Sequence, residues 1–212
     1  LGLGATTGVL NITNATLDNT NGNIFIASGG TSTGTVTVNA GGTLIQNHTN
    51  RDINMHNGTS TLTINAGGTV QADRNLNQAN SNTSTINLNG GTLDVDDNIF
   101  DRGGTSILNY SSGTILVDAN DGNNVDGSAA FDTLTVLGST LTTSQTTGTG
   151  DLRASAFVRA RNIHLDGSTA AATLEIGNDE FQSWGDVTST GPNATSITIL
   201  SGGDFIQTNN GS

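Results

Sequence analysis

The chain of 212 residues contains no cysteine, no lysine and only one proline, Pro192. The lack of cysteine excludes disulfide bonds and thiolate metal sites. No apolar run approaches the about 18 residues of a membrane-spanning helix, so we expect no membrane insertion. Aromatic residues make up 4% of the chain and hydrophobic residues 33%. This is little bulky apolar material for a globular core of this size, so the composition favours a thin core.

Positive charge is also scarce. The six basic residues are all arginine, against 18 acidic residues, and the formal net charge is −12. Such a surface repels phosphate backbones and anionic lipid headgroups, so we expect no nucleic-acid partner and no binding to anionic membranes. An acidic surface rich in Thr and Asn is typical of an extracellular or cell-surface protein.

A Thr followed by an apolar residue recurs after small turns at intervals of 22 to 27 residues. The six occurrences are Thr16-Leu17, Thr43-Leu44, Thr69-Val70, Thr92-Leu93, Thr114-Ile115 and Thr140-Leu141. A period of this length indicates a solenoid, in which each repeat buries its apolar face against the next one.

Within each repeat, apolar and polar residues alternate strictly, as in 35–38, 61–64 and 85–88. A period of two indicates strands, with one apolar face turned inward. We therefore predict an all-β fold, a single-stranded parallel β-helix (β-solenoid) with three short strands per rung of about 22–27 residues. The predicted inward columns are Val36, Leu62, Ile86 and Leu108; Val38, Ile64, Leu88 and Tyr110; Leu17, Leu44, Val70, Leu93, Ile115 and Leu141; and Ile24, Ile53, Leu76 and Ile99.

Asn39, Asn65 and Asn89 each end a strand just before a glycine-containing corner. Stacked at one corner, their side-chain amides are expected to hydrogen-bond along the column as a ladder. This is a structural role for asparagine.

The repeat is clear over residues 1–145 and fragmentary over 146–212, which we expect to continue the same domain irregularly. Residues 177–193 contain Phe181, Trp184 and Pro192 and no periodicity. Because solenoid ends expose a cut core and unpaired strand edges, we expect this stretch to form a loop or a cap.

The segments TVTVNAGGTLIQ, TLTINAGGTVQA and TINLNGGTLDVD resemble the repetitive parallel β-helix regions of bacterial secreted and surface proteins, including autotransporter passengers and large anchored exoproteins. The resemblance covers about two thirds of the chain and concerns the fold. It implies export and a role at or beyond the cell surface as an adhesin, a matrix component or a filament. It implies no catalytic residues.

Two acidic turns on successive rungs are the candidate metal site. The candidate ligands are Asp94, Asp96, Asp118, Asp121 and Asp126. Calcium takes six to eight oxygen ligands, so Ca²⁺ is the one cofactor that these residues could hold. The spacing departs from a calcium-binding loop, and ordinary solvated turns are the alternative.

We expect a structural or adhesive extracellular β-solenoid, with itself or surface glycans and proteins as partners. The amino end is apolar and has no charged residue before Asp18, so it could stack on the carboxy-terminal end of another copy. Such a head-to-tail contact does not close on itself and would therefore build a filament. The residues expected at that contact are Leu1, Leu3, Val9, Leu10 and Ile12.

Two alternative functions remain open. Paired carboxylates on a β-helix are compatible with a carbohydrate-binding or polysaccharide-degrading protein. The chain has no lysine and no recognisable catalytic arrangement, so we expect no enzyme. Outward Thr rows resemble those of ice-binding solenoids. These rows would contain Thr35/Thr37, Thr61/Thr63, Thr85/Asn87, Thr133/Thr135 and Ser196/Thr198.

Overall fold

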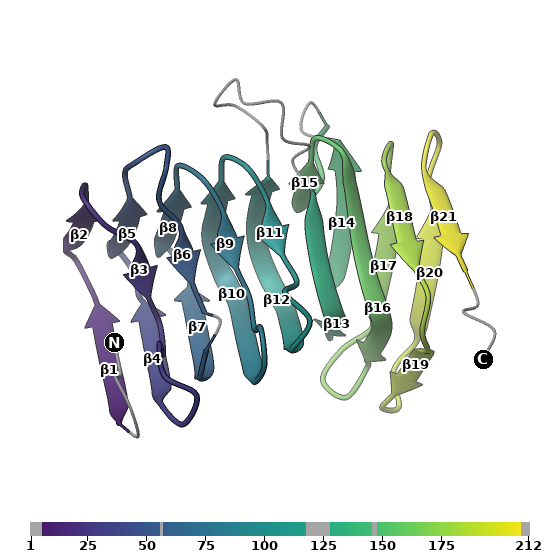
Figure 1. The fold of residues 1–212 in the computed structure, drawn as a ribbon. Helices are drawn as coiled ribbons and strands as arrows, with labels where there is room; N and C mark the ends of the chain where they lie inside the picture. The colour runs from purple at the N-terminus through teal and green to yellow at the C-terminus, as the bar shows by residue number, and fades with distance from the viewer. Residues whose placement is uncertain (1–5, 56, 118–127, 146–147, 209–212) are drawn as a thin grey trace.

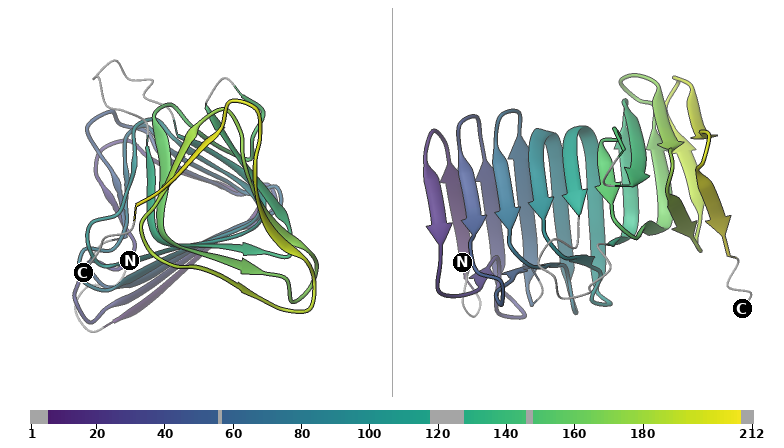
Figure 2. Two further views of the ribbon diagram at one scale, coloured as in Figure 1. Left: turned by 90° about the vertical axis from the view of Figure 1, so that its right-hand side faces the viewer. Right: turned by 90° about the horizontal axis from the view of Figure 1, so that it is seen from above.

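The computed structural model describes residues 6–55, 57–117, 128–145 and 148–208, which form a parallel β-solenoid of about eight stacked coils (Figure 1). The strand pairs are parallel, and the described ranges contain no helix. Viewed along the axis, the coils superpose as a triangle (Figure 2). The predicted fold class and the three strands per rung are confirmed.

Each side of the triangle is one parallel sheet that runs along the axis. The first face contains β1 (Thr7–Ile12), β4 (Thr33–Val38), β7 (Thr59–Asn65), the first halves of β10 (Thr83–Val95) and β12 (Thr105–Val117), the second halves of β13 (Ala129–Leu137) and β16 (Phe157–Asp166), and β19 (Val187–Thr190).

The second face contains β2 (Thr16–Asn19), β5 (Thr43–Gln46), β8 (Thr69–Ala72), the second halves of β10 and β12, then β15 (Leu152–Ala154), β14 (Thr140–Gln145), β17 (Ala172–Ile176) and β20 (Thr195–Ile199). The third face contains β3 (Ile24–Phe25), β6 (Ile53–Asn54), β9 (Leu76–Asn77), β11 (Ile99–Phe100), the first halves of β13 and β16, then β18 (Glu180–Ser183) and β21 (Asp204–Gln207).

The alternating side chains fill a thin aliphatic core. The predicted columns point inward, and most of their members are fully buried, among them Val38, Ile64, Leu88, Leu44 and Ile53. Because every coil offers the same short aliphatic residues, a chain with few aromatic side chains still closes its core.

The predicted asparagine ladder is present at the corner between the first and second faces. Asn65 donates to the Oδ1 atom of Asn39 (2.8 Å), and Asn89 donates to the Oδ1 atom of Asn65 (3.2 Å). Beside it, Gly41 and Gly67 adopt φ angles of 67° and 74°, a region that glycine enters without steric cost. The ladder satisfies amides that would otherwise be left without partners at a tight corner.

One strand of the second face is out of chain order. β15 lies between β12 and β14, because Leu152 pairs with Ile115 on one side and with Thr143 on the other. The prediction that Leu141 follows Ile115 in one column is therefore wrong. Leu141 instead begins a column with Leu174 in the next coil.

The connection into β15 folds back on itself. The backbone N–H of Asp151 donates to the carbonyl of Thr142 (2.7 Å), and that of Gly150 donates to the hydroxyl of Ser144 (3.0 Å). These bonds return the chain to the start of the same face, so the second face has one strand more than the others.

Residues 177–193, for which we expected a loop or a cap, contain two paired strands instead. β18 pairs with β16 and β21, and β19 pairs with β16. Phe181 is fully buried in the core and lies 6.0 Å from Phe205 between ring centroids. The bulky residues that suggested a cap therefore continue the coil.

Candidate functional site

The third face differs from the other two in composition. It holds all the phenylalanines and borders the only tryptophan: Phe25, Phe100, Phe131, Phe157, Phe181 and Phe205 lie in its strands, and Trp184 directly follows β18. The outward side chains there include planar polar and aromatic groups, whereas the first face carries mainly Thr and Asn. Phe131 and Phe181 are buried in the core and Phe205 packs against it, so Phe25, Phe100, Phe157 and Trp184 are the aromatic side chains that this face offers to a ligand.

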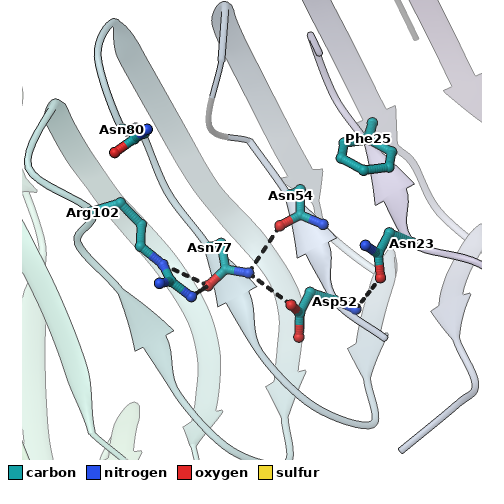
Figure 3. A pocket seen from close by; sticks show the side chains of 7 residues that line it. All are labelled: Asn23, Phe25, Asp52, Asn54, Asn77, Asn80 and Arg102. Atoms are coloured by element: carbon teal, nitrogen blue, oxygen red, sulfur yellow. Dashed lines mark hydrogen bonds between the residues drawn. The ribbon is translucent and has the colours of Figure 1, made fainter. Parts of the chain in front are cut away.

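A groove of about 390 Å³ lies on this face over the first four coils (Figure 3). Its lining residues are Asn23, Phe25, Asp52, Asn54, Asn77, Asn80 and Arg102. We call this the third-face groove.

The local sequence explains how the strands form the groove. In β6 and β9, Ile53 and Leu76 point into the core, so the following residues, Asn54 and Asn77, must point outward. Phe25 occupies the equivalent position in the coil before Asn54, and Asn77 occupies it in the coil after. A row of two amides and one aromatic ring therefore forms the floor.

Hydrogen bonds between coils hold the floor rigid. Asn77 donates to Asn54 Oδ1 (2.9 Å) and to Asp52 Oδ2 (3.0 Å), and Asn75 donates to Asp52 Oδ1 (3.2 Å). Arg74 lies 3.6 Å from the same carboxylate. Asp52 is thus fixed by partners from the next coil.

Arg102 closes one end of the groove. Its Nε atom donates to Asn77 Oδ1 (3.0 Å), and its guanidinium lies 4.8 Å from the centroid of the Phe100 ring. Figure 3 shows Arg102 and Phe25 at opposite ends of the row, with the amides between them. Stacking and hydrogen bonding together fix the plane of the guanidinium.

Some groups of the groove remain available to a ligand. Asn80 is exposed and has no hydrogen-bond partner among the described residues; the Nδ2 atom of Asn54 has none either, although Asn54 is only 3% exposed. Phe25 is 39% exposed. The groove thus offers amide donors and acceptors beside an aromatic face, and these groups suit a ligand with both hydroxyl groups and C–H surfaces.

The candidate calcium ligands are only partly placed. Asp94 and Asp96 flank the inward Val95 on the second face and are half-buried. Asp118, Asp121 and Asp126 lie outside the described residues. Within the described residues, no group of three His, Asp or Glu side chains could hold a metal ion.

The candidate self-association residues have different environments. Ile12 is buried in the core and Leu10 packs partly against it, whereas Val9 points outward and is 62% exposed. Leu1 and Leu3 lie outside the described residues.

The Thr rows are less regular than predicted. Thr35, Thr61 and Thr85 stack on the first face, but Ile107 follows them. The placement of Ser196 and Thr198 in these rows is wrong, because they belong to β20 on the second face. The ice-binding alternative stays a prediction.

The third-face groove was not predicted from the sequence. A signal was present, because Asn23, Asp52 and Asn75 each precede an aliphatic residue of the fourth predicted column. Asn80 and Arg102 come from the turns after the strands, and no local sequence pattern predicts that they lie beside the floor of the groove.

No family model matches the chain, and no curated protein or solved structure matches it. Among the described residues, no helix is long and apolar enough to cross a membrane.

Proposed function

We propose that this protein is an extracellular or cell-surface adhesive solenoid that binds carbohydrate in the third-face groove without catalysing a reaction. The observation that carries the proposal is the groove itself. It places an exposed aromatic ring, amides with unused donors and an oriented guanidinium on one rigid surface. Sugars present hydroxyl edges and C–H faces that these groups complement.

The groups of the groove favour binding over hydrolysis. A glycosidase needs two carboxyl groups on either side of the scissile bond. Asp52 is the only acid among the seven lining residues, and both its oxygens accept hydrogen bonds from neighbouring amides. Because both oxygens of Asp52 already accept hydrogen bonds, this carboxylate is suited to holding the side chains of the groove in place and not to exchanging a proton with a ligand.

A glycan-array screen followed by titration calorimetry tests the proposal. Asn80→Ala and Phe25→Ala should each weaken binding of the selected glycan, by about 1 kcal/mol for one lost hydrogen bond and somewhat more for the aromatic ring. Asn11→Ala is the matched control, because Asn11 is an exposed asparagine of the first face. Equal loss in all three variants, or no glycan bound by the native chain, would contradict the proposal.

Self-assembly is a second candidate function. The large hydrophobic residues that are exposed among the described residues all lie in or beside the first and last coils: Val9, Leu17, Phe25, Val187, Ile199 and Leu200. Leu17, Val187 and Ile199 continue inward columns and are exposed because no further coil of the described residues covers them. Stacking of one copy on the next would bury these side chains and pair the free strand edges.

A further inference from the structure

A second group of planar side chains lies on the third face, two coils beyond Arg102. Arg159 lies in β16 with its guanidinium 5.6 Å from the centroid of Phe157 and 5.8 Å from that of Trp184. We call Phe157, Arg159 and Trp184 the arginine-aromatic cluster. All three are half-buried, so the rings fix the guanidinium and leave part of it open to solvent.

Arg159 has no carboxylate or hydrogen-bond partner among the described residues. Its Nε atom is buried and unsatisfied. The acid on the neighbouring strand, Glu180, accepts a hydrogen bond from Gln182 instead. Arg51, Arg102 and Arg153 also lack a carboxylate within 4 Å among the described residues, but only Arg159 has two aromatic rings beside its guanidinium.

Three other arginines near this face already have partners, Arg102 with Asn77 and Arg74 and Arg161 with carboxylates, while Arg51 is exposed in a turn with no aromatic ring beside it among the described residues. Arg74 lies within 4 Å of Asp52 and Asp97, and Arg161 lies 4.0 Å from Asp132. Arg159 is therefore the guanidinium on this face best able to take an anionic group from a ligand.

We propose that the arginine-aromatic cluster binds a carboxylate of an acidic polysaccharide that lies along the solenoid axis. This inference rests on the proposed carbohydrate function of the third-face groove. The coils of Arg102 and Arg159 are two steps apart, about 10 Å at the usual strand spacing, so one chain of several sugars can reach both sites. The net charge of −12 opposes a densely charged polymer, so the ligand has widely spaced carboxylates.

The test uses a glucuronate-containing octasaccharide of hyaluronan and its methyl ester, which differ only in the charge of the carboxyl groups. Titration calorimetry of the native chain should show about tenfold tighter binding of the acid than of the ester, the effect of one charge-assisted hydrogen bond. Arg159→Gln should abolish this preference. Arg159→Lys should keep part of it, because lysine retains the charge but not the planar fork.

Arg161→Gln is the matched control, since the Arg161 side chain is 60% exposed two residues along β16, at the corner between the third and first faces, and is already paired with Asp132. It should keep the full preference. Thermal melting of each variant, read beside the titrations, verifies that the coil is intact.

Two results would overturn the carboxylate site. These are equal binding of acid and ester to the native chain, or an unchanged preference in folded Arg159→Gln. A different result would contradict only the proposed role of the groove. In that case Asn80→Ala leaves the binding of both forms unchanged while Arg159→Gln removes the preference, which would mean that the cluster binds the acid and the groove does not contribute.

Discussion

Single residues in this solenoid are stabilised mainly by partners one coil away. Asn65 illustrates this, because its amide donates to Asn39 and its carbonyl oxygen accepts from Asn89. A buried polar atom that lacks such a partner stands out against this pattern. The Oδ2 atom of Asp179 is an example.

Asp179 is 4% exposed, and its Oδ1 atom accepts a hydrogen bond from Thr143 (3.0 Å). Its Oδ2 atom has no partner among the described residues. Burial raises the pKa of this carboxyl above its usual 3.8, although the Thr143 hydrogen bond opposes the shift. Ionisation of Asp179 in the folded state therefore costs stability.

The raised pKa predicts how stability changes with pH. Stability that is fully present below about 3.8, the unfolded value, is lost as the pH rises through the folded pKa of Asp179. Asp179→Asn should therefore raise the melting temperature at pH 7 by a few degrees and change it little near pH 3. Thermal melts of both proteins at the two pH values measure this, and a lower melting temperature for the variant at pH 7 would contradict it.

At the scale of strands, the sequence is informative wherever the pattern is local. The alternation around Val36 and Val38 predicts which side chains point inward, because a strand's faces are determined by its own residues. The spacing of the Thr-apolar pairs predicts the coil. The spacing also predicts which strands are neighbours, but only where the coils follow one another in chain order.

The position of β15 shows this limit. Leu152 lies between Ile115 and Thr143 because a return connection brings it there, and its three-residue strand carries no distinguishing pattern. The third-face groove was missed for a related reason. Asn80 and Arg102 come from different turns, and only the stacking of coils brings them together.

The return connection gives a prediction at this scale. A Cβ atom added to Gly150 would lie 2.7 Å from both the Thr142 carbonyl oxygen and the Ser144 hydroxyl, too close for either to stay in place. Gly150→Ala should therefore lower the free energy of unfolding by about 1–3 kcal/mol.

Gly22→Ala is the control for this change, because nothing lies within 4 Å of the added methyl group. Its effect should stay within about 0.5 kcal/mol. Denaturant titrations of both variants measure the difference, and equal stability would show that β15 is not held by this tight connection.

At the scale of the whole molecule, the apolar side chains exposed on the first and last described coils predict self-association. Sedimentation velocity of the native chain should show larger species as the protein concentration rises. These species should persist in high salt, since backbone pairing and apolar contact drive the association while salt screens the repulsion between acidic subunits.

Ile199→Lys should abolish this association, because Ile199 is 54% exposed in the last coil. Thr198→Lys is the matched control, since Thr198 is its exposed neighbour on the same strand and points away from the core axis. Native chains that stay monomeric at every concentration and salt would remove the filament as a candidate function.

Hydrogen-deuterium exchange, measured with and without the tightest-binding glycan, tests most directly whether a ligand binds on the third face. We predict that the glycan slows exchange in the turns beside the third-face groove, residues 47–52 and 78–82, and leaves β4 and β7 of the first face unchanged. Slower exchange on the first face or in the end coils, with no slowing beside the groove, would contradict ligand binding on the third face.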